Sequence, residues 1–178
     1  FGGNRVSSLR VSKAEIRAAY KAVDQNFLSA LKQMKKAITA VHKAQLPKKI
    51  DTTVYPEPGI AVWREWRPIE RVGLYVPGGK AIYPSSVLMN AIPATIAGCK
   101  QIVLCTPPRG NGEIPAPTLV AADMADIDTI YKIGGPMAIA AMAYGTKSIP
   151  KVYKIFGPGN AYVTAAKMLT LDTVAIDM

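Results

Sequence analysis

The sequence is poor in the side chains that bind transition metals. Its 178 residues include two cysteines and one histidine. Cys99 and Cys105 are separated by five residues, too many for a metal-binding pair of the C-x-x-C kind. His42 lies in a basic stretch far from both, and we interpret it as a solvated residue near a helix end. We expect no zinc site from these residues alone, and we interpret the cysteines as buried, reduced thiols of a cytoplasmic protein.

The sequence also lacks a long uncharged apolar run, which excludes a membrane-spanning helix. An apolar signal core is missing from its start as well. The first residue is Phe1 rather than methionine, and the last residues, DTVAIDM, form an apolar run typical of a strand. We therefore expect the chain to be an internal piece of a longer protein.

Acidic residues are scarce in one part of the chain only. Residues 1–50 contain 11 Lys or Arg and 2 Asp or Glu, whereas residues 51–178 contain 11 and 10. The net charge of +10 therefore comes almost entirely from the N-terminal segment. No aromatic residues are interleaved there in a stacking pattern, and no nucleic-acid-binding motif is present. We interpret the charge as a basic helix face or an interface, and we expect no nucleic-acid partner.

Residues 12–46 are predicted to form one helix. Ser12 and Glu15 have the spacing of a capping box, and Pro47 prevents the helix from continuing. Apolar residues recur at steps of three and four, which is typical of an amphipathic helix; they are Phe27, Leu31, Met34, Ile38 and Val41. We expect this stripe to pack against a sheet.

The following stretch, TTVYPEPGIAVWREWRPIERVGLYV, is rich in β-forming residues around a PEPG turn. It predicts antiparallel β structure. We interpret Trp63 and Trp66 as core or interface residues rather than as a platform for a ligand.

From residue 72 onward, five strand-like runs alternate with four helix-like ones. Strands separated by helices cannot pair as hairpins, so this order predicts a parallel sheet with helices on its faces. The helix within SSVLMNAIPATIAGC is expected to have Ser85 or Ser86 as its N-cap and to be kinked or broken at Pro93. The predicted class is α/β: a Rossmann-like parallel sheet flanked by helices, preceded by a helical and antiparallel β segment.

Three glycine-bearing loops each follow a predicted strand and precede a predicted helix: residues 77–79, residues 134–135 and Gly157-Pro158-Gly159-Asn160. Glycines there serve either to turn the chain or to leave the backbone bare for a ligand. Ligands of parallel α/β sheets bind at this edge, where helix N-termini present free N–H groups. None of the loops matches the dinucleotide fingerprint or the P-loop. The residues alone indicate a nucleotide-binding α/β domain.

Three segments of the chain resemble the histidinol dehydrogenase family: RVGLYVPGGKAIYPSSVLMNAIPATIAGCKQIVLCTPP, IYKIGGPMAIAAMAYGTKSIPKVYKIFGPGNAYVTAAK and the closing VAIDM. The resemblance extends over essentially the whole chain, and LYVPGG followed by GPGN is specific to it. It implies incomplete Rossmann-like units in an intertwined homodimer. Residues 1–72 would belong to a first α/β domain and residues 73–178 to an NAD-binding unit.

The resemblance also implies an activity. The family oxidises L-histidinol to L-histidine through an aldehyde, in two hydride transfers to NAD⁺, with zinc anchoring the substrate. On this basis the catalytic and zinc-binding residues lie beyond residue 178, and we expect the fragment alone to be inactive. The NAD contacts carried over to this sequence are Tyr75 and Asn160. A third, a glutamine in the family, falls on Met137, whose thioether accepts hydrogen bonds only weakly.

Asn160 and Tyr75 each also have a purely structural interpretation. Asn160 has the residue type and the position of a helix N-cap, and Tyr75 could be a core aromatic at a strand end. Two other functions remain open from the sequence: another NAD-dependent dehydrogenase with an aldehyde-dehydrogenase-like or generic Rossmann unit, and a non-enzymatic basic binding module.

Overall fold

The computed structural model describes residue 6 and residues 8–78, 81–127 and 129–177. These residues form helices and strands in the order α1 (Lys13–Lys21), α2 (Gln25–Gln45), β1 (Ile50–Val54), β2 (Val62–Glu65), β3 (Arg71–Tyr75), α3 (Pro84–Ala97), β4 (Gln101–Thr106), α4 (Ala116–Met124), β5 (Thr129–Lys132), α5 (Gly135–Tyr144), β6 (Lys154–Phe156), α6 (Ala161–Leu169) and β7 (Ala175–Ile176). None of the described helices is long and apolar enough to cross a membrane.

The five strand-like runs pair into one sheet in the order β5-β4-β3-β6-β7, and every pairing is parallel. The predicted parallel α/β class is therefore confirmed. The central strands are apolar along their length because both faces of the sheet are covered. Neighbouring residues consequently point to different cores: Leu74 packs in one and Tyr75 in the other.

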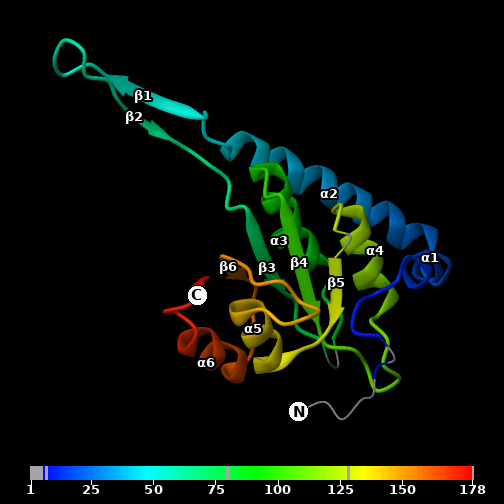
Figure 1. Ribbon diagram of the computed structural model, residues 1–178. Coiled ribbons are helices and arrows are strands. Elements are labelled where there is room, and N and C mark those ends of the chain that lie inside the picture. The colour runs from blue at the N-terminus through cyan, green and yellow to red at the C-terminus, as the bar shows by residue number, and fades with distance from the viewer. Residues whose placement is uncertain (1–5, 7, 79–80, 128, 178) are drawn as a thin grey trace.

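The two faces of the sheet carry different helices. Helices α1 to α4 supply the first core, together with Leu74, Leu104 and Ile130 of the strands. Helices α5 and α6 supply the second, together with Val103 and Ile155. Figure 1 shows α2 running along the outside of α3 and α4. The sheet thus has helices on both faces, and α2 packs on α3 and α4 rather than against the sheet as predicted.

The predicted antiparallel segment is confirmed as the β1–β2 hairpin, in which Thr53 pairs with Trp63 and Val54 with Val62. Figure 1 shows the hairpin projecting away from the layered body. Of the two alternatives predicted for Trp63 and Trp66, core or interface, the core is excluded because both side chains are about half exposed, and the interface stays a prediction. The Arg64 guanidinium lies 5.2 Å from the centre of the Trp66 ring instead.

The prediction of a single helix over residues 12–46 is wrong. The capping box at its start is present: the Glu15 N–H donates to Ser12 Oγ over 3.2 Å, and the Ser12 N–H donates to Glu15 Oε2 over 2.9 Å. However, α1 ends at Lys21, and Asp24 begins a second helix by accepting a hydrogen bond from the Phe27 N–H over 2.7 Å. An aspartate side chain satisfies free N–H groups at a helix start, so it favours a new N-terminus over continuation.

Two details of the predicted helices also differ. In the apolar stripe of α2, Leu31 and Ile38 are buried, but Met34, between them in the chain, and Val41, near the C-terminal end of the helix, are exposed. Helix α3 begins at Pro84 with Tyr83 as its N-cap, rather than with Ser85 or Ser86. Proline is well suited to a first turn because no N–H is needed there.

Helix α3 is continuous through Pro93, which excludes the predicted break and leaves the alternative, a kink, as a prediction. The predicted boundary between residues 72 and 73 falls inside β3, and α1 and α2 share a core with α3 and α4. The division of the chain into two domains stays a prediction.

Candidate functional site

The strand order changes direction between β3 and β6. These two strands are neighbours in the sheet, with Leu74 opposite Phe156. The chain leaves β3 toward α3 on one face and leaves β6 toward α6 on the other. The two connections diverge, which leaves a crevice at the carboxyl ends of the strands where α/β proteins bind ligands. The GPGN loop borders this point.

The glycines of the loop are required by the packing of the chain itself. Gly157 has φ +113°, and a Cβ there would lie 2.0 Å from the carbonyl oxygen of Tyr75. A Cβ on Gly159 would lie 2.3 Å from Cγ1 of Val163. The loop therefore packs directly on the end of β3 and on the first turn of α6, which leaves its role as a cofactor cradle a prediction.

Asn160 occupies the N-cap of α6, where its Oδ1 accepts a hydrogen bond from the Val163 N–H over 3.1 Å. The structural reading of this residue is thus correct. Its side chain is nevertheless exposed at the edge of the sheet where ligands bind. The capping bond occupies the carbonyl oxygen and fixes the side chain at the start of α6.

Tyr75 ends β3 and is only 4% exposed. Its hydroxyl accepts a hydrogen bond from the Gly135 N–H over 3.1 Å. Burial raises the pKa of Tyr75, although the bond from Gly135 acts in the opposite direction. The Tyr75 side chain therefore supports the start of α5, whereas Asn160 caps α6. Both residues lie at the carboxyl edge of the sheet, but Tyr75 ends strand β3 and Asn160 ends the loop after β6.

Met137 lies in the first turn of α5 and is 54% exposed. The loop that precedes this helix is held close to the one after β4: a Cβ on Gly134 would lie 2.4 Å from Cβ of Pro107. A Cβ on Gly78, after β3, would lie 2.7 Å from Cγ of the same proline. Gly79, the last residue of that glycine loop, lies outside the described residues. Three neighbouring loops thus form one continuous edge.

A cavity of about 450 Å³ adjoins the GPGN loop, lined by Asn90, Gly157, Pro158, Gly159, Thr164, Lys167 and Asp177. It contains a buried lysine that the sequence does not predict as a site residue. Lys167 is two turns along α6 from Asn160, and no short motif marks it. Only its contacts in the folded chain reveal it.

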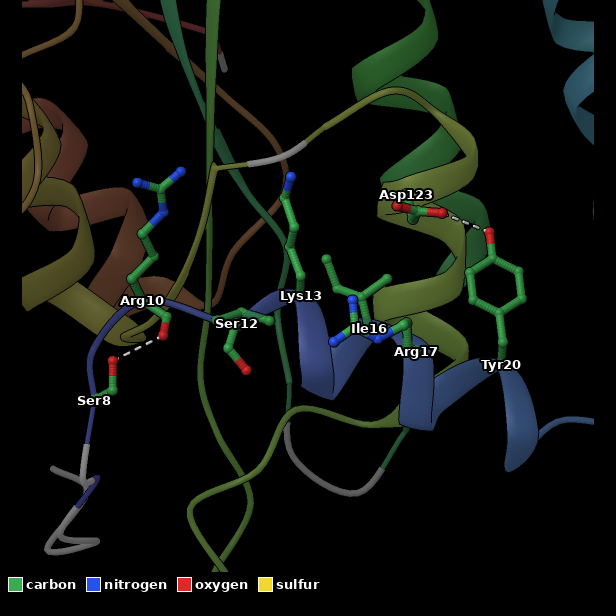
Figure 2. A pocket seen from close by; sticks show the side chains of 9 residues that line it. Ser8, Arg10, Ser12, Lys13, Ile16, Arg17, Tyr20 and Asp123 are labelled. Carbon is green, nitrogen blue, oxygen red and sulfur yellow. Dashed lines mark hydrogen bonds between the residues drawn. The ribbon is translucent and has the colours of Figure 1, made fainter.

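A larger cavity, about 670 Å³, lies on the other side of the molecule along α1 and is shown in Figure 2. The Tyr20 hydroxyl there donates to Asp123 Oδ2 over 2.7 Å. Burial and this bond raise the pKa of Tyr20 to about 12. This cavity is bounded by α1 and α4 rather than by the diverging loops, so we favour the smaller cavity as the candidate site.

The residues weighed as metal ligands are scattered. Both cysteines are free; Cys105 is fully buried, which raises the pKa of its thiol to about 12, and Cys99 is partly buried. His42 lies in the last turn of α2, half-buried. Among the described residues, no group of three or more His, Cys, Asp or Glu side chains could hold a metal ion.

The fold and the crevice define the class: a doubly wound parallel α/β protein with its candidate ligand site where the strand order reverses. The model of the histidinol dehydrogenase family matches residues 1–178, and the chain belongs to that family.

The proteins to which the chain is similar include members of the same family. The chain is 54% identical to a histidinol dehydrogenase of Bacteroides fragilis (strain YCH46), with 100% of the chain and 41% of the relative covered. It is 48% identical to one of Methanothermobacter thermautotrophicus, with 99% and 41% covered. The crystal structure of histidinol dehydrogenase from Elizabethkingia anophelis matches with a TM-score of 0.95 and 45% identity, over 100% of this chain and 41% of that one. The chain thus spans about two fifths of the length of these proteins.

Proposed function

We propose that this chain forms the NAD-binding part of an enzyme that oxidises L-histidinol to L-histidine in the cytoplasm. The observation that carries the proposal is the family match over all 178 residues, combined with a crevice at the point where the strand order reverses. NAD⁺, when bound, would supply the hydride acceptor, one NAD⁺ for the alcohol and a second for the hydrated aldehyde, with water providing the second oxygen of the carboxylate.

The residues at the crevice fit a dinucleotide. The exposed amide of Asn160 provides a hydrogen-bonding group beside the first turn of α6, whose N–H groups favour anionic ligands. Tyr75 is nearly covered, so its part is to hold the Gly135 N–H in place and to offer only its hydroxyl edge. Met137 presents an apolar side chain where the family has glutamine, and it can pack on a ring or a ribose.

The remaining chemistry belongs to the rest of the protein. The described residues do not offer a zinc-binding group, so we propose that the zinc ligands and the acid–base residues lie beyond residue 178. The residues of this chain bind and orient the nucleotide, and they cover one side of it from water. We propose a homodimer for the complete enzyme, and we expect residues 1–178 alone to form no NADH from histidinol.

The proposal is tested with the full-length protein that carries this chain, by following histidinol-dependent formation of NADH with zinc present. Asn160→Ala should weaken NAD⁺ binding about fivefold, which corresponds to one hydrogen bond of about 1 kcal/mol. The affinity for histidinol should be unchanged.

Asp24→Ala is the matched control, because it removes the same kind of capping bond from α2, away from the crevice. It should lower stability without changing the affinity for NAD⁺. No NADH formation by the unaltered protein would contradict the proposed activity, and a change in histidinol affinity alone would show that Asn160 faces the other ligand.

A further inference from the structure

The buried ammonium group of Lys167 contacts the loop that carries Asn160. The Lys167 side chain is 7% exposed. Its Nζ donates to the carbonyl oxygen of Gly157 over 2.7 Å, and it forms an ion pair with Oδ1 of Asp177. A longer contact of 3.5 Å joins Nζ to the Asp177 carbonyl oxygen. Side chains on a helix lean toward its N-terminus, so a lysine two turns into α6 can reach back to the loop before it.

Asp177 binds the backbone N–H of Gly157, the residue whose carbonyl oxygen Lys167 binds. It follows β7 directly, and its Oδ2 accepts a hydrogen bond from the Gly157 N–H over 2.9 Å. The N–H and the C=O of Gly157 are thus both bound by one ion pair. Because Gly157 has a positive φ and packs on Tyr75, these two bonds and that contact together fix the direction in which the chain leaves β6.

An ion pair of this kind is not needed simply to fill space. Withdrawing an ammonium group from water is unfavourable unless it is fully paired, and apolar residues of similar size often stabilise a protein as well or better. What an apolar pair could not do is bind a backbone N–H and a C=O at once. The geometry therefore favours a positioning role over a contribution to stability alone.

We propose that Lys167 and Asp177 are positioning residues that hold the GPGN loop, and through it Asn160 and the first turn of α6, in the geometry that binds NAD⁺. This role rests on the proposed function. Neither residue needs to touch the nucleotide. They act through Gly157, three residues before Asn160 in the chain.

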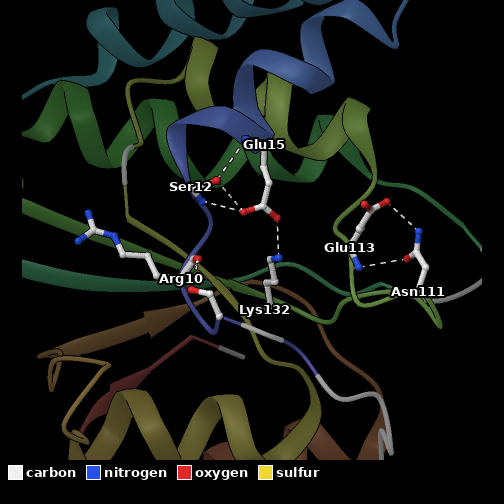
Figure 3. A network of polar contacts seen from close by, with 7 residues as sticks. Arg10, Ser12, Glu15, Asn111, Glu113 and Lys132 are labelled. Atoms are coloured by element: carbon white, nitrogen blue, oxygen red, sulfur yellow. Dashed lines mark hydrogen bonds and ion pairs between the residues drawn. The ribbon is translucent and has the colours of Figure 1, made fainter.

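The test uses Lys167→Met in the full-length protein, with NAD⁺ binding measured by titration and the KM values for NAD⁺ and histidinol measured separately. The chain offers a matched control. Lys132, at the end of β5, is also 7% exposed in its side chain and forms an ion pair with Glu15 over 2.5 Å, as Figure 3 shows. That pair joins β5 to α1, at the far edge of the sheet from the GPGN loop. Lys132→Met therefore removes a comparable buried charge elsewhere.

Lys167→Met should weaken NAD⁺ binding about tenfold or more, with the KM for histidinol changed less than about twofold. Lys132→Met should lower the melting temperature similarly but leave the NAD⁺ affinity within about twofold. Asp177→Asn retains an acceptor for the Gly157 N–H, so it should show an intermediate loss of about three- to fivefold. Amide hydrogen exchange at residues 157–163 should be faster in Lys167→Met than in Lys132→Met.

Equal effects of Lys167→Met and Lys132→Met on NAD⁺ affinity would overturn the positioning role while leaving the proposed function intact. If Lys167→Met does not fold, Asp177→Asn decides, and an unchanged affinity for NAD⁺ in that variant overturns the role. Absence of NAD⁺ binding by the unaltered protein would instead overturn the proposed function, and the positioning role with it.

Discussion

The central sheet and the β1–β2 hairpin are made of similar residues but bury them differently. Leu74 and Leu104 of the sheet are fully buried, whereas Val54, Val62 and Trp63 of the hairpin are about half exposed. The reason is that helices cover both faces of the sheet, while the hairpin projects from the body with none of the described helices packed on it (Figure 1). Residue type predicts that a segment is a strand, but burial depends on what covers that strand.

The largest expected difference between the two regions concerns their glycines with positive φ. Gly157 of the body has φ +113° and Gly59 of the hairpin turn has φ +85°, but a Cβ at Gly59 would meet nothing within 4 Å. Gly59→Ala should cost about 1 kcal/mol, the strain of the backbone alone. Gly157→Ala should cost more than about 4 kcal/mol, because the new methyl group collides with Tyr75. Urea unfolding of both variants measures this, and equal losses would contradict the packing of the loop on β3.

A second comparison concerns apolar side chains of the sheet and of the hairpin, each replaced by alanine. Leu104→Ala should lower the free energy of unfolding by about 3 kcal/mol, because it opens a cavity in a core that cannot fully collapse. Trp63→Ala should lower it by less than about 1 kcal/mol in residues 1–178, since the indole is 54% exposed.

Repeating the Trp63→Ala measurement in the full-length protein separates two readings of the hairpin. A much greater loss there would indicate that the indole is an interface residue, covered by the rest of the protein. A loss as large as that of Leu104→Ala within residues 1–178 would show that the hairpin is packed and that the contrast is wrong.

A buried ion pair and an exposed ion pair should also differ in how much they contribute to stability. Burial acts to raise the pKa of Glu15, but the hydrogen bonds from Lys132 and Ser12 outweigh it and hold this pKa below 4.5. Glu65 forms an exposed ion pair with Arg67, and hydrogen bonding to Arg67 is the main cause that lowers the pKa of Glu65. In both cases the folded state favours the ionised carboxylate. The resulting stability is present at neutral pH and is lost as the pH falls below 4.5 through the lowered pKa.

We therefore expect Glu15→Gln to lower the melting temperature at neutral pH in low and high salt alike, and Glu65→Gln to have a small effect that disappears at about 1 M salt. Both deficits should shrink at about pH 3. Thermal melts across pH and salt measure this. A deficit of Glu15→Gln that grows on acidification would contradict the sign assigned to its pKa.

The smallest effect is expected at Met137, which is as exposed as Trp63 although it belongs to the body. If its exposed side faces the nucleotide, Met137→Gln should change NAD⁺ affinity by less than about threefold, in the direction of tighter binding. NAD⁺ titration of both forms of the full-length protein at one salt and pH provides the measurement. A loss approaching about tenfold, or 1.4 kcal/mol, would indicate that Met137 packs on the cofactor in a remodelled pocket.

Much of the fold could be predicted because its signals are local. The alternation of apolar runs with helical ones gave the five parallel strands and four helices of residues 72–178, and the Ser12–Glu15 spacing gave the capping box. The error at residues 22–24 was also local: Asp24 is a good N-cap, but its capping signal was outweighed by the apolar stripe that follows it. The candidate site was predicted as a set of loops; the described residues of these loops lie at one edge of the sheet, and their role in binding stays a prediction.

The amino-acid sequence by itself determined the class of the fold, the glycine-bearing loops and the family to which the chain belongs, since each depends on residues close together in the chain. The tertiary structure alone decided what those residues contact. Gly157 faces Tyr75, Lys167 pairs with Asp177, and Lys132 pairs with Glu15. These partners are 10 to 117 residues apart in the sequence. They meet only because the parallel sheet brings the ends of its strands, and the helices next to them, into contact.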